Sequence, residues 1–146
     1  MTSPDAATDL SREASDLRIA TFRLARRMRT QRAVDSMSDG QFAVLAALWV
    51  HGSHTLGELA DRERVSAPAM NRTVNCLQEN GYLARSADEN DGRKVVITLT
   101  DDGRGVVDET ARRRDAWVEE ALGGMTADER EILARAAEIM QRMVAS

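Results

Sequence analysis

Side chains that can form hydrogen bonds to nucleic-acid bases are grouped in the middle of the chain. Asn71, Arg72 and Asn75 fall on one segment with helical periodicity. Its apolar residues Val74 and Leu77 must hold the helix to a scaffold, so the three polar side chains turn outward. An Asn amide can form two hydrogen bonds to adenine, and an Arg guanidinium can do the same to guanine. Plain solvation of the asparagines is the alternative, and the fit of both flanking elements disfavours it.

The start of the same helix offers groups suited to phosphate oxygens. Ser66 is the expected N-cap, and Pro68 fits the first turn because its missing N–H costs nothing there. The hydroxyls of Ser66 and Thr73 and the N–H groups of the helix N-terminus suit phosphates. The residues predicted to contact DNA from this helix are Ser66, Ala67, Asn71, Arg72, Thr73 and Asn75.

A second predicted contact is a polar turn that ends in cations. Arg93 would stand at the tip of a β-hairpin, from which a long cation can enter the minor groove. Asp91 could orient that guanidinium through a bidentate pair, or it could simply form the turn, since Asp-Gly is a hairpin dipeptide. Lys94 and Arg85 are predicted phosphate contacts, with plain solvation as a nearly equal alternative.

Capping signals mark the helices that must position these residues. Potential capping boxes begin at Ser38, Thr55 and Thr126, and each has Gln or Glu three residues later. Two short helices, over about 56–64 and 66–80, are joined by a tight turn, which is the helix-turn-helix pattern. Gly81 ends the second of them.

The periodicity changes from helical to alternating after Gly81. Residues 83–87 and 94–99 read as two strands, and the polar residues 88–92 form the turn between them. Thr100 is the expected N-cap of a further helix, which Gly123 and Gly124 interrupt. The sequence predicts a mainly helical α+β fold with a two-stranded hairpin beside the helix-turn-helix.

The segments 71–85 and 91–103 together resemble the multiple antibiotic resistance regulator (MarR) family. The shared pattern is a recognition helix, a Gly turn leading to Arg85, an Asp-x-Arg tip at Asp91 and Arg93, and a strand that ends in Leu-Thr with Gly103 three residues on. The resemblance covers essentially the whole chain. It implies a winged helix-turn-helix fold, with Arg93 inserted into DNA and Asp91 supporting it.

Long amphipathic helices are predicted at both ends of the chain. Apolar residues recur in steps of three and four from Leu10 to Met28, and the last helix is apolar on a broad face. Such faces need a partner, which makes a homodimer the expectation, and packing within one subunit competes with it. The predicted organisation is a flexible arm at 1–8, dimerisation helices at 9–34 and 101–146, and a winged helix-turn-helix unit at 38–100.

Composition narrows the class of protein. The 146 residues are 42% hydrophobic and 30% charged, which is typical of a soluble globular protein, and no apolar run is long enough to span a bilayer. The net charge is −4, and residues 55–94 hold six basic and seven acidic residues. DNA binding must therefore depend on a few placed groups or on segregation of charge. The expected location is the cytoplasm.

Other kinds of site find little support in the sequence. His51 and His54 stand in a loop without a second Cys or His cluster, so no metal site, no cofactor and no catalytic activity are predicted. Cys76, the single cysteine, excludes an internal disulfide. We expect it to be a half-buried structural thiol rather than a redox switch.

The family resemblance also implies a mechanism. It points to a dimeric repressor that binds a pseudo-palindromic operator and is released by a small aromatic or phenolic ligand. The residues that could line such a ligand pocket, between the DNA-binding unit and the terminal helices, are Arg18, Arg26, Trp49, His51 and Trp117. The alternative function is a winged-helix module that binds proteins and no longer binds DNA.

Overall fold

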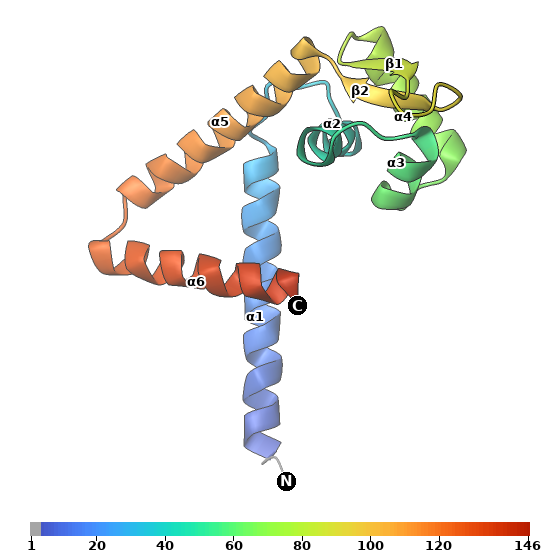
Figure 1. Ribbon diagram of the computed structural model, residues 1–146. Helices are drawn as coiled ribbons and strands as arrows, with labels where there is room; N and C mark the ends of the chain where they lie inside the picture. The colour runs from blue at the N-terminus through green and yellow to red at the C-terminus, as the bar shows by residue number, and fades with distance from the viewer. Residues whose placement is uncertain (1–3) are drawn as a thin grey trace.

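The chain folds into a head, formed by residues 39–99, on a frame of long helices (Figure 1). The computed structural model describes residues 4–146, and their side chains from residue 7 onward. The elements in chain order are α1 (Pro4–Arg29), α2 (Asp39–His51), α3 (Leu56–Glu63), α4 (Ala67–Glu79), β1 (Leu83–Ala87), β2 (Val95–Leu99), α5 (Asp101–Gly123) and α6 (Ala127–Ala145). The mainly helical α+β class predicted from the sequence is confirmed.

The head is built around one apolar core. Its fully buried side chains come from each of the four elements α2, α3, α4 and β2, and they include Leu45, Leu59, Leu77 and Ile97. Burying a side chain of this size stabilises the fold by about 2 kcal/mol before the entropy cost is counted. This core fixes α4 against α2 and α3, so the outer face of α4 has a defined direction.

The wing is an antiparallel pair of strands. β1 and β2 pair from Leu83 opposite Leu99 to Ala87 opposite Val95. The backbone of His54 forms two hydrogen bonds with that of Ile97, at 2.7 and 3.2 Å. This isolated bridge extends the sheet by one residue beside β2. The expected strand over 94–99 begins one residue later, because the backbone of Lys94 pairs with Asp88 and Asp91 in the turn.

The helix starts follow the capping signals with one difference. The capping boxes at Ser38 and Thr126 are both complete. At Thr55 only one half forms: its hydroxyl accepts from the N–H of Glu58, at 3.2 Å. Among the described residues, the exposed side chain of Glu58 makes no return bond to the N–H of Thr55. Ser66 and Thr100 cap α4 and α5 as predicted.

The expected flexible arm at 1–8 needs correction. Helix α1 already begins at Pro4, where a proline suits the first turn because it needs no hydrogen bond there. Residues 1–3 of the expected arm lie outside the described part of the chain. Within residues 4–146, no helix has both the length and the apolar character that crossing a bilayer requires.

Two glycines allow the head to join α5. Gly81 has a φ of 83°, a conformation that favours glycine, and it turns the chain from α4 into β1. Gly103 lies against the backbone of Tyr82, and a Cβ atom there would clash with the Tyr82 carbonyl oxygen and lie 2.8 Å from Leu99 Cδ1. The Leu-Thr-x-x-Gly pattern therefore serves close packing of α5 on the head.

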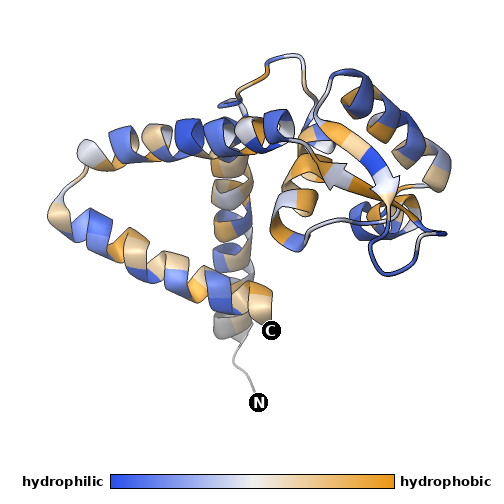
Figure 2. Cartoon of the chain, turned by 45° about the horizontal axis from the view of Figure 1, so that its top comes forward, coloured by the Kyte–Doolittle hydropathy of each residue, from blue (hydrophilic) through white to orange (hydrophobic). Residues whose placement is uncertain are grey.

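The two terminal helices lie mostly outside the core. Figure 1 shows α6 crossing α1 below the long α5. No residue of α6 is buried, and the helix exposes apolar side chains such as Ile132, Met143 and Val144. Figure 2 shows hydrophobic and hydrophilic residues alternating along α5 and α6.

Candidate nucleic-acid interface

Helices α3 and α4 form a tight helix-turn-helix. Arg64, with a φ of 55° in the left-handed region, ends α3, and the N–H of Val65 donates to the carbonyl of Ala60. Ser66 then caps α4, where its hydroxyl accepts from the N–H of Ala69 at 3.2 Å. The buried Met70, Val74 and Leu77 hold one side of α4 to the head, which leaves the opposite side open.

The open side of α4 carries most of the predicted contacts. Ser66, Ala67, Asn71 and Arg72 are exposed, whereas Thr73 and Asn75 are half-buried. Among the described residues, no hydrogen bond or ion pair is formed by the side chain of Arg72. Its guanidinium therefore keeps its donors for an outside acceptor.

Thr73 is less available than the sequence suggested. Its hydroxyl donates to the carbonyl oxygen of Ala69, one turn back in the same helix, at 3.3 Å. A phosphate oxygen needs a donor, and this proton is already in use. Its expected phosphate contact would therefore require the hydroxyl to rotate away from Ala69.

Arg85 reaches from the wing back to α4. One terminal nitrogen, Nη1, donates to Asn75 Oδ1 at 2.9 Å and to Gln78 Oε1 at 2.8 Å. The other, Nη2, donates to Asn71 Oδ1 at 3.1 Å. The guanidinium expected to contact phosphate thus holds three amide groups of the helix.

The wing tip is a compact turn with cations beside it. Asp91 Oδ1 accepts from the backbone N–H of Arg93 at 3.1 Å, and the N–H of Lys94 donates to the carbonyl of Asp91 at 3.0 Å. Asp91 therefore forms the turn, and the bidentate pair with the Arg93 guanidinium is not among the contacts of the described residues. Arg93 and Lys94 are both exposed.

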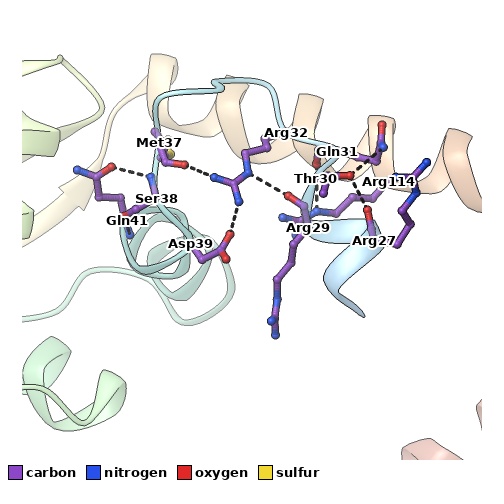
Figure 3. A network of polar contacts seen from close by, with 10 residues as sticks. All are labelled: Arg27, Arg29, Thr30, Gln31, Arg32, Met37, Ser38, Asp39, Gln41 and Arg114. Carbon is purple, nitrogen blue, oxygen red and sulfur yellow. Dashed lines mark hydrogen bonds and ion pairs between the residues drawn. The ribbon is translucent and has the colours of Figure 1, made fainter. Parts of the chain in front are cut away.

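A polar junction connects this head to the long helices (Figure 3). Arg32 donates to the carbonyl oxygen of Met37 at 2.6 Å and forms an ion pair with Asp39 at 2.7 Å. Arg113 of α5 donates to the carbonyl oxygen of Arg32 at 2.7 Å. The loop between α1 and α2 is thereby fixed against α5.

Two further contacts complete the junction. Arg114 donates to the carbonyl oxygen of Gln31 and lies over the ring of Phe42. Burial lowers the pKa of Arg114 from its ordinary value, although the group stays a cation at neutral pH. Thr110, buried on α5, accepts from the N–H of Ala33 at 3.2 Å.

An ion-pair cluster on α5 lies beside the junction. Glu109 accepts hydrogen bonds from Arg112 and Arg113 at 2.7 to 3.0 Å. These bonds lower the pKa of Glu109 to about 2, and the bonds that Arg112 donates to Glu109 raise the pKa of Arg112. The cluster keeps Arg113 oriented towards the loop that precedes α2.

The five candidate ligand-binding residues lie on α1, α2 and α5. Arg18 lines an apolar groove of about 360 Å³ between α1 and α6, and the other four do not line that groove. Arg26 lies in the last turn of α1, and Trp117 is half-buried on α5. Trp49 and His51 are exposed at the end of α2.

The structure also describes the surroundings of Cys76 and the groups that could bind a metal ion. Cys76 is half-buried, as expected, and its sulfur accepts from Gln41 Nε2 at 3.3 Å. Within the part of the chain that the structure describes, no group of three or more His, Cys, Asp or Glu side chains could hold a metal ion.

The residues of the junction were not predicted from the sequence, and neither were the hydrogen bonds that Arg85 donates to three amide side chains of α4. Arg32, Arg113, Arg114 and Thr110 carry no motif that singles them out in the sequence. The Asn71, Asn75 and Gln78 spacing of four and three residues was a visible sign that these amides share one stripe of α4.

Comparison with known proteins decides the family. The sequence model of the MarR family matches residues 37–95. A helix-turn-helix-type transcriptional regulator of Mycobacterium bovis is 36% identical over 134 residues, which cover 92% of this chain and 94% of that protein. The chain belongs to the MarR family.

Solved structures agree with this assignment of a MarR-family regulator. The crystal structure of a putative transcriptional regulator from Pseudomonas aeruginosa is 27% identical and superimposes with a TM-score of 0.83, over 94% of this chain and 97% of that one. A mutant of MepR from S. aureus, bound to an oligodeoxyribonucleotide, shares the fold with a TM-score of 0.69 at 16% identity, over 90% and 97% of the two chains. The winged helix of this MarR-family chain is a DNA-binding unit, and the protein is a transcriptional regulator.

Proposed function

We propose that this MarR-family protein is a homodimeric repressor that binds a pseudo-palindromic operator through α4 and the wing. The observation that carries the proposal is the open face of α4, where Asn71 and Arg72 are exposed, in one head with the exposed Arg93 of the wing tip. Repression is the direction of regulation that the family resemblance implies.

The proposed contacts divide between two grooves. Helix α4 has the dimensions that the major groove admits, and Arg72 can form two hydrogen bonds to guanine there. Arg93 stands at the end of the hairpin, where an arginine can enter the negative potential of a narrow minor groove. Lys94 and the N-terminus of α4, with Ser66 and Ala67, supply groups for the phosphate backbone.

A second copy of the chain is the proposed cover for the terminal helices. The apolar side chains that α1 leaves exposed include Leu17 and Phe22, and those of α6 include Ile132 and Met143. Of these, Leu17, Phe22 and Met143 also line the groove between the two helices. A contiguous apolar surface of this kind is unusual on a monomer, and a twofold partner would bury it.

Substitution can test the dimer directly. Phe22→Glu places a charge on the apolar face of α1, and sedimentation analysis should then show a monomer at micromolar concentration where the parent chain is a dimer. Val95 is a matched control because it is a similarly exposed apolar residue on the wing. Val95→Glu should leave the dimer intact, and a monomeric parent chain would contradict the proposal.

Release by a small aromatic acid is the proposed regulation. The groove between α1 and α6, which the partner chain would roof over without filling, has apolar walls from Leu17, Phe22 and Met140, with the cation Arg18 among them. Such a site suits an aromatic ring with a carboxylate. Benzoate should lower the affinity of the parent protein for operator DNA and have little effect on Arg18→Gln. An equal effect on both would remove Arg18 from the site.

The function as a whole is tested by selection from randomised duplex DNA at a stated salt concentration. We expect enrichment of a two-part site with half-sites about one helical turn apart, bound by two chains. Recovery of no common sequence, with only salt-sensitive binding to all duplexes, would contradict the proposal.

A further inference from the structure

Three amides of α4 form a single stripe that faces the wing. Asn71, Asn75 and Gln78 are separated by four and three residues, so they follow one another along the same side of the helix. This stripe runs beside the buried Met70, Val74 and Leu77. It therefore lies at the border between the core contact and the open face of α4.

Arg85 is aimed at this stripe by the geometry of β1. It stands two residues after the buried Leu83, so both side chains leave the strand on the same face, towards α4. Three of its five N–H groups donate to the side-chain oxygens of Asn71, Asn75 and Gln78, at 2.8 to 3.1 Å. No acid takes part in these bonds.

The chemistry of the guanidinium determines how each amide is turned. Arginine carries donors and no acceptor, so the atom that each amide offers to Arg85 must be its oxygen. The NH₂ group of each amide is then directed elsewhere. For the exposed Asn71, this leaves the NH₂ as the group available to an outside partner.

The fixed amides limit what α4 can recognise. The two-bond contact of Asn with adenine needs the oxygen and the NH₂ of one amide on the same base. In this structure the Asn71 oxygen is turned to Arg85, whose Nη2 takes one of its two lone pairs. A donor alone suits base edges that accept, such as O6 and N7 of guanine, N7 of adenine or O4 of thymine.

We propose that Arg85 is a positioning residue that sets the base preference of α4 by holding the amides of Asn71, Asn75 and Gln78 with their NH₂ groups outward. This inference rests on the proposed function, in which α4 lies in the major groove. It replaces the role of Arg85 as a phosphate contact and the role of Asn71 as a two-bond adenine reader.

The test compares Arg85→Lys, which keeps the positive charge but loses the planar fork, with Asn71→Ala in selection from randomised duplex DNA. The positions at which Asn71→Ala relaxes base preference identify the bases that Asn71 faces. We expect Arg85→Lys to lower the preference at those same positions by about tenfold, with an unchanged dependence of binding on salt. Arg104→Lys, the same change at an exposed arginine of α5, should alter neither.

A phosphate contact would give the opposite pattern. Arg85→Lys would then keep the selected sequence, and Arg85→Gln would weaken binding to all sequences equally and reduce the salt slope by about one. That pair of results would overturn the proposal. A strong preference for adenine over guanine at the Asn71 positions in the parent protein would overturn it as well, because a lone donor to N7 does not distinguish the two purines.

A measurement without DNA separates this proposal from the proposed function. Side-chain ¹⁵N relaxation should show rigid NH₂ groups for Asn71, Asn75 and Gln78 in the parent protein and mobile ones in Arg85→Lys. Asn90, exposed at the wing tip, gives an internal reference for a mobile amide. Equal mobility in both proteins would refute positioning by Arg85, whereas failure of the parent protein to select any sequence would refute only the DNA function.

Discussion

The guanidinium carbon of Arg114 lies 4.7 Å from the centre of the Phe42 ring. This contact joins α5, which leads to the terminal helices, to α2, which supports the head. The same arginine donates to the carbonyl oxygen of Gln31 at the end of α1. This one side chain therefore links α5, α2 and the segment that follows α1.

Replacing Arg114 should loosen the junction. Because Arg114→Gln removes a partly buried cation–π contact, we expect it to lower the free energy of unfolding by about 1 kcal/mol. Chemical denaturation gives this difference. Arg112→Gln is the matched control, since Arg112 is exposed and bonds only to Glu109 among the described residues. Arg112→Gln should lower the free energy of unfolding by less than about 0.5 kcal/mol. An equal loss for both variants would show that the contact of Arg114 with Phe42 adds no stability.

Gly103 should tolerate no side chain. A Cβ there would meet the Tyr82 carbonyl and Leu99, so Gly103→Ala should lower the free energy of unfolding by about 1–3 kcal/mol. Gly105 provides the control because a Cβ there would meet nothing within 4 Å. Gly105→Ala should stabilise the helix by about 0.5–1 kcal/mol. If thermal denaturation shows that both changes stabilise the protein, then α5 does not approach the head as closely as described.

Local signals in the sequence were enough for the elements of the fold. Ser38, Ser66, Thr100 and Thr126 each cap the helix that follows, because a hydroxyl there accepts from the free N–H groups of the first turn. The alternation after Gly81 located both strands to within one residue. These features depend on neighbours in the chain, which is why they could be read without the structure.

The contacts between distant residues were not predictable in the same way. Arg85 meets Asn71 across 14 positions, and Arg113 meets Arg32 across 81. Several exposed arginines look alike from their neighbours in the sequence. Their partners are determined by tertiary packing, of β1 on α4 for Arg85 and of α5 on the α1–α2 loop for Arg113. The bond that the backbone N–H of Arg93 donates to Asp91 was one of two alternatives that spacing left open.

The ion pair on α5 should make stability depend on acid pH. The pKa of Glu109 is lowered to about 2, below the value of 4.5 for a free glutamate, so folding favours its ionised form. Its contribution is present above about pH 4.5 and is lost as the pH falls towards 2. Glu109→Gln should therefore be less stable than the parent protein at about pH 6, and the two should converge near pH 2.

Denaturation curves at the two pH values measure this effect. The difference at about pH 6 should shrink in roughly 1 M salt, because Arg112 and Arg113 are exposed and their interaction with Glu109 is screened. A difference that stays constant across pH and salt would mean that Glu109 acts through packing instead of charge.

Arg93 should increase the affinity for DNA without changing which bases α4 prefers in the major groove. Arg93→Ala is expected to weaken binding to all duplexes and to reduce the slope of log affinity against log salt by about one. Lys94→Ala, beside it, should show a similar loss if both reach the backbone. Fluorescence anisotropy titrations at several salt concentrations give the slopes. An unchanged slope for Arg93→Ala would place the wing tip away from the DNA.

The most direct test of DNA recognition by α4 is a titration of Arg72→Ala against the selected operator and an unrelated duplex at one salt concentration. The parent protein should prefer the operator by a factor of about a thousand or more. Arg72→Ala should lose about tenfold or more of that preference while keeping its affinity for the unrelated duplex within a few fold. An undiminished preference in Arg72→Ala would contradict the central claim that the exposed face of α4 reads the bases.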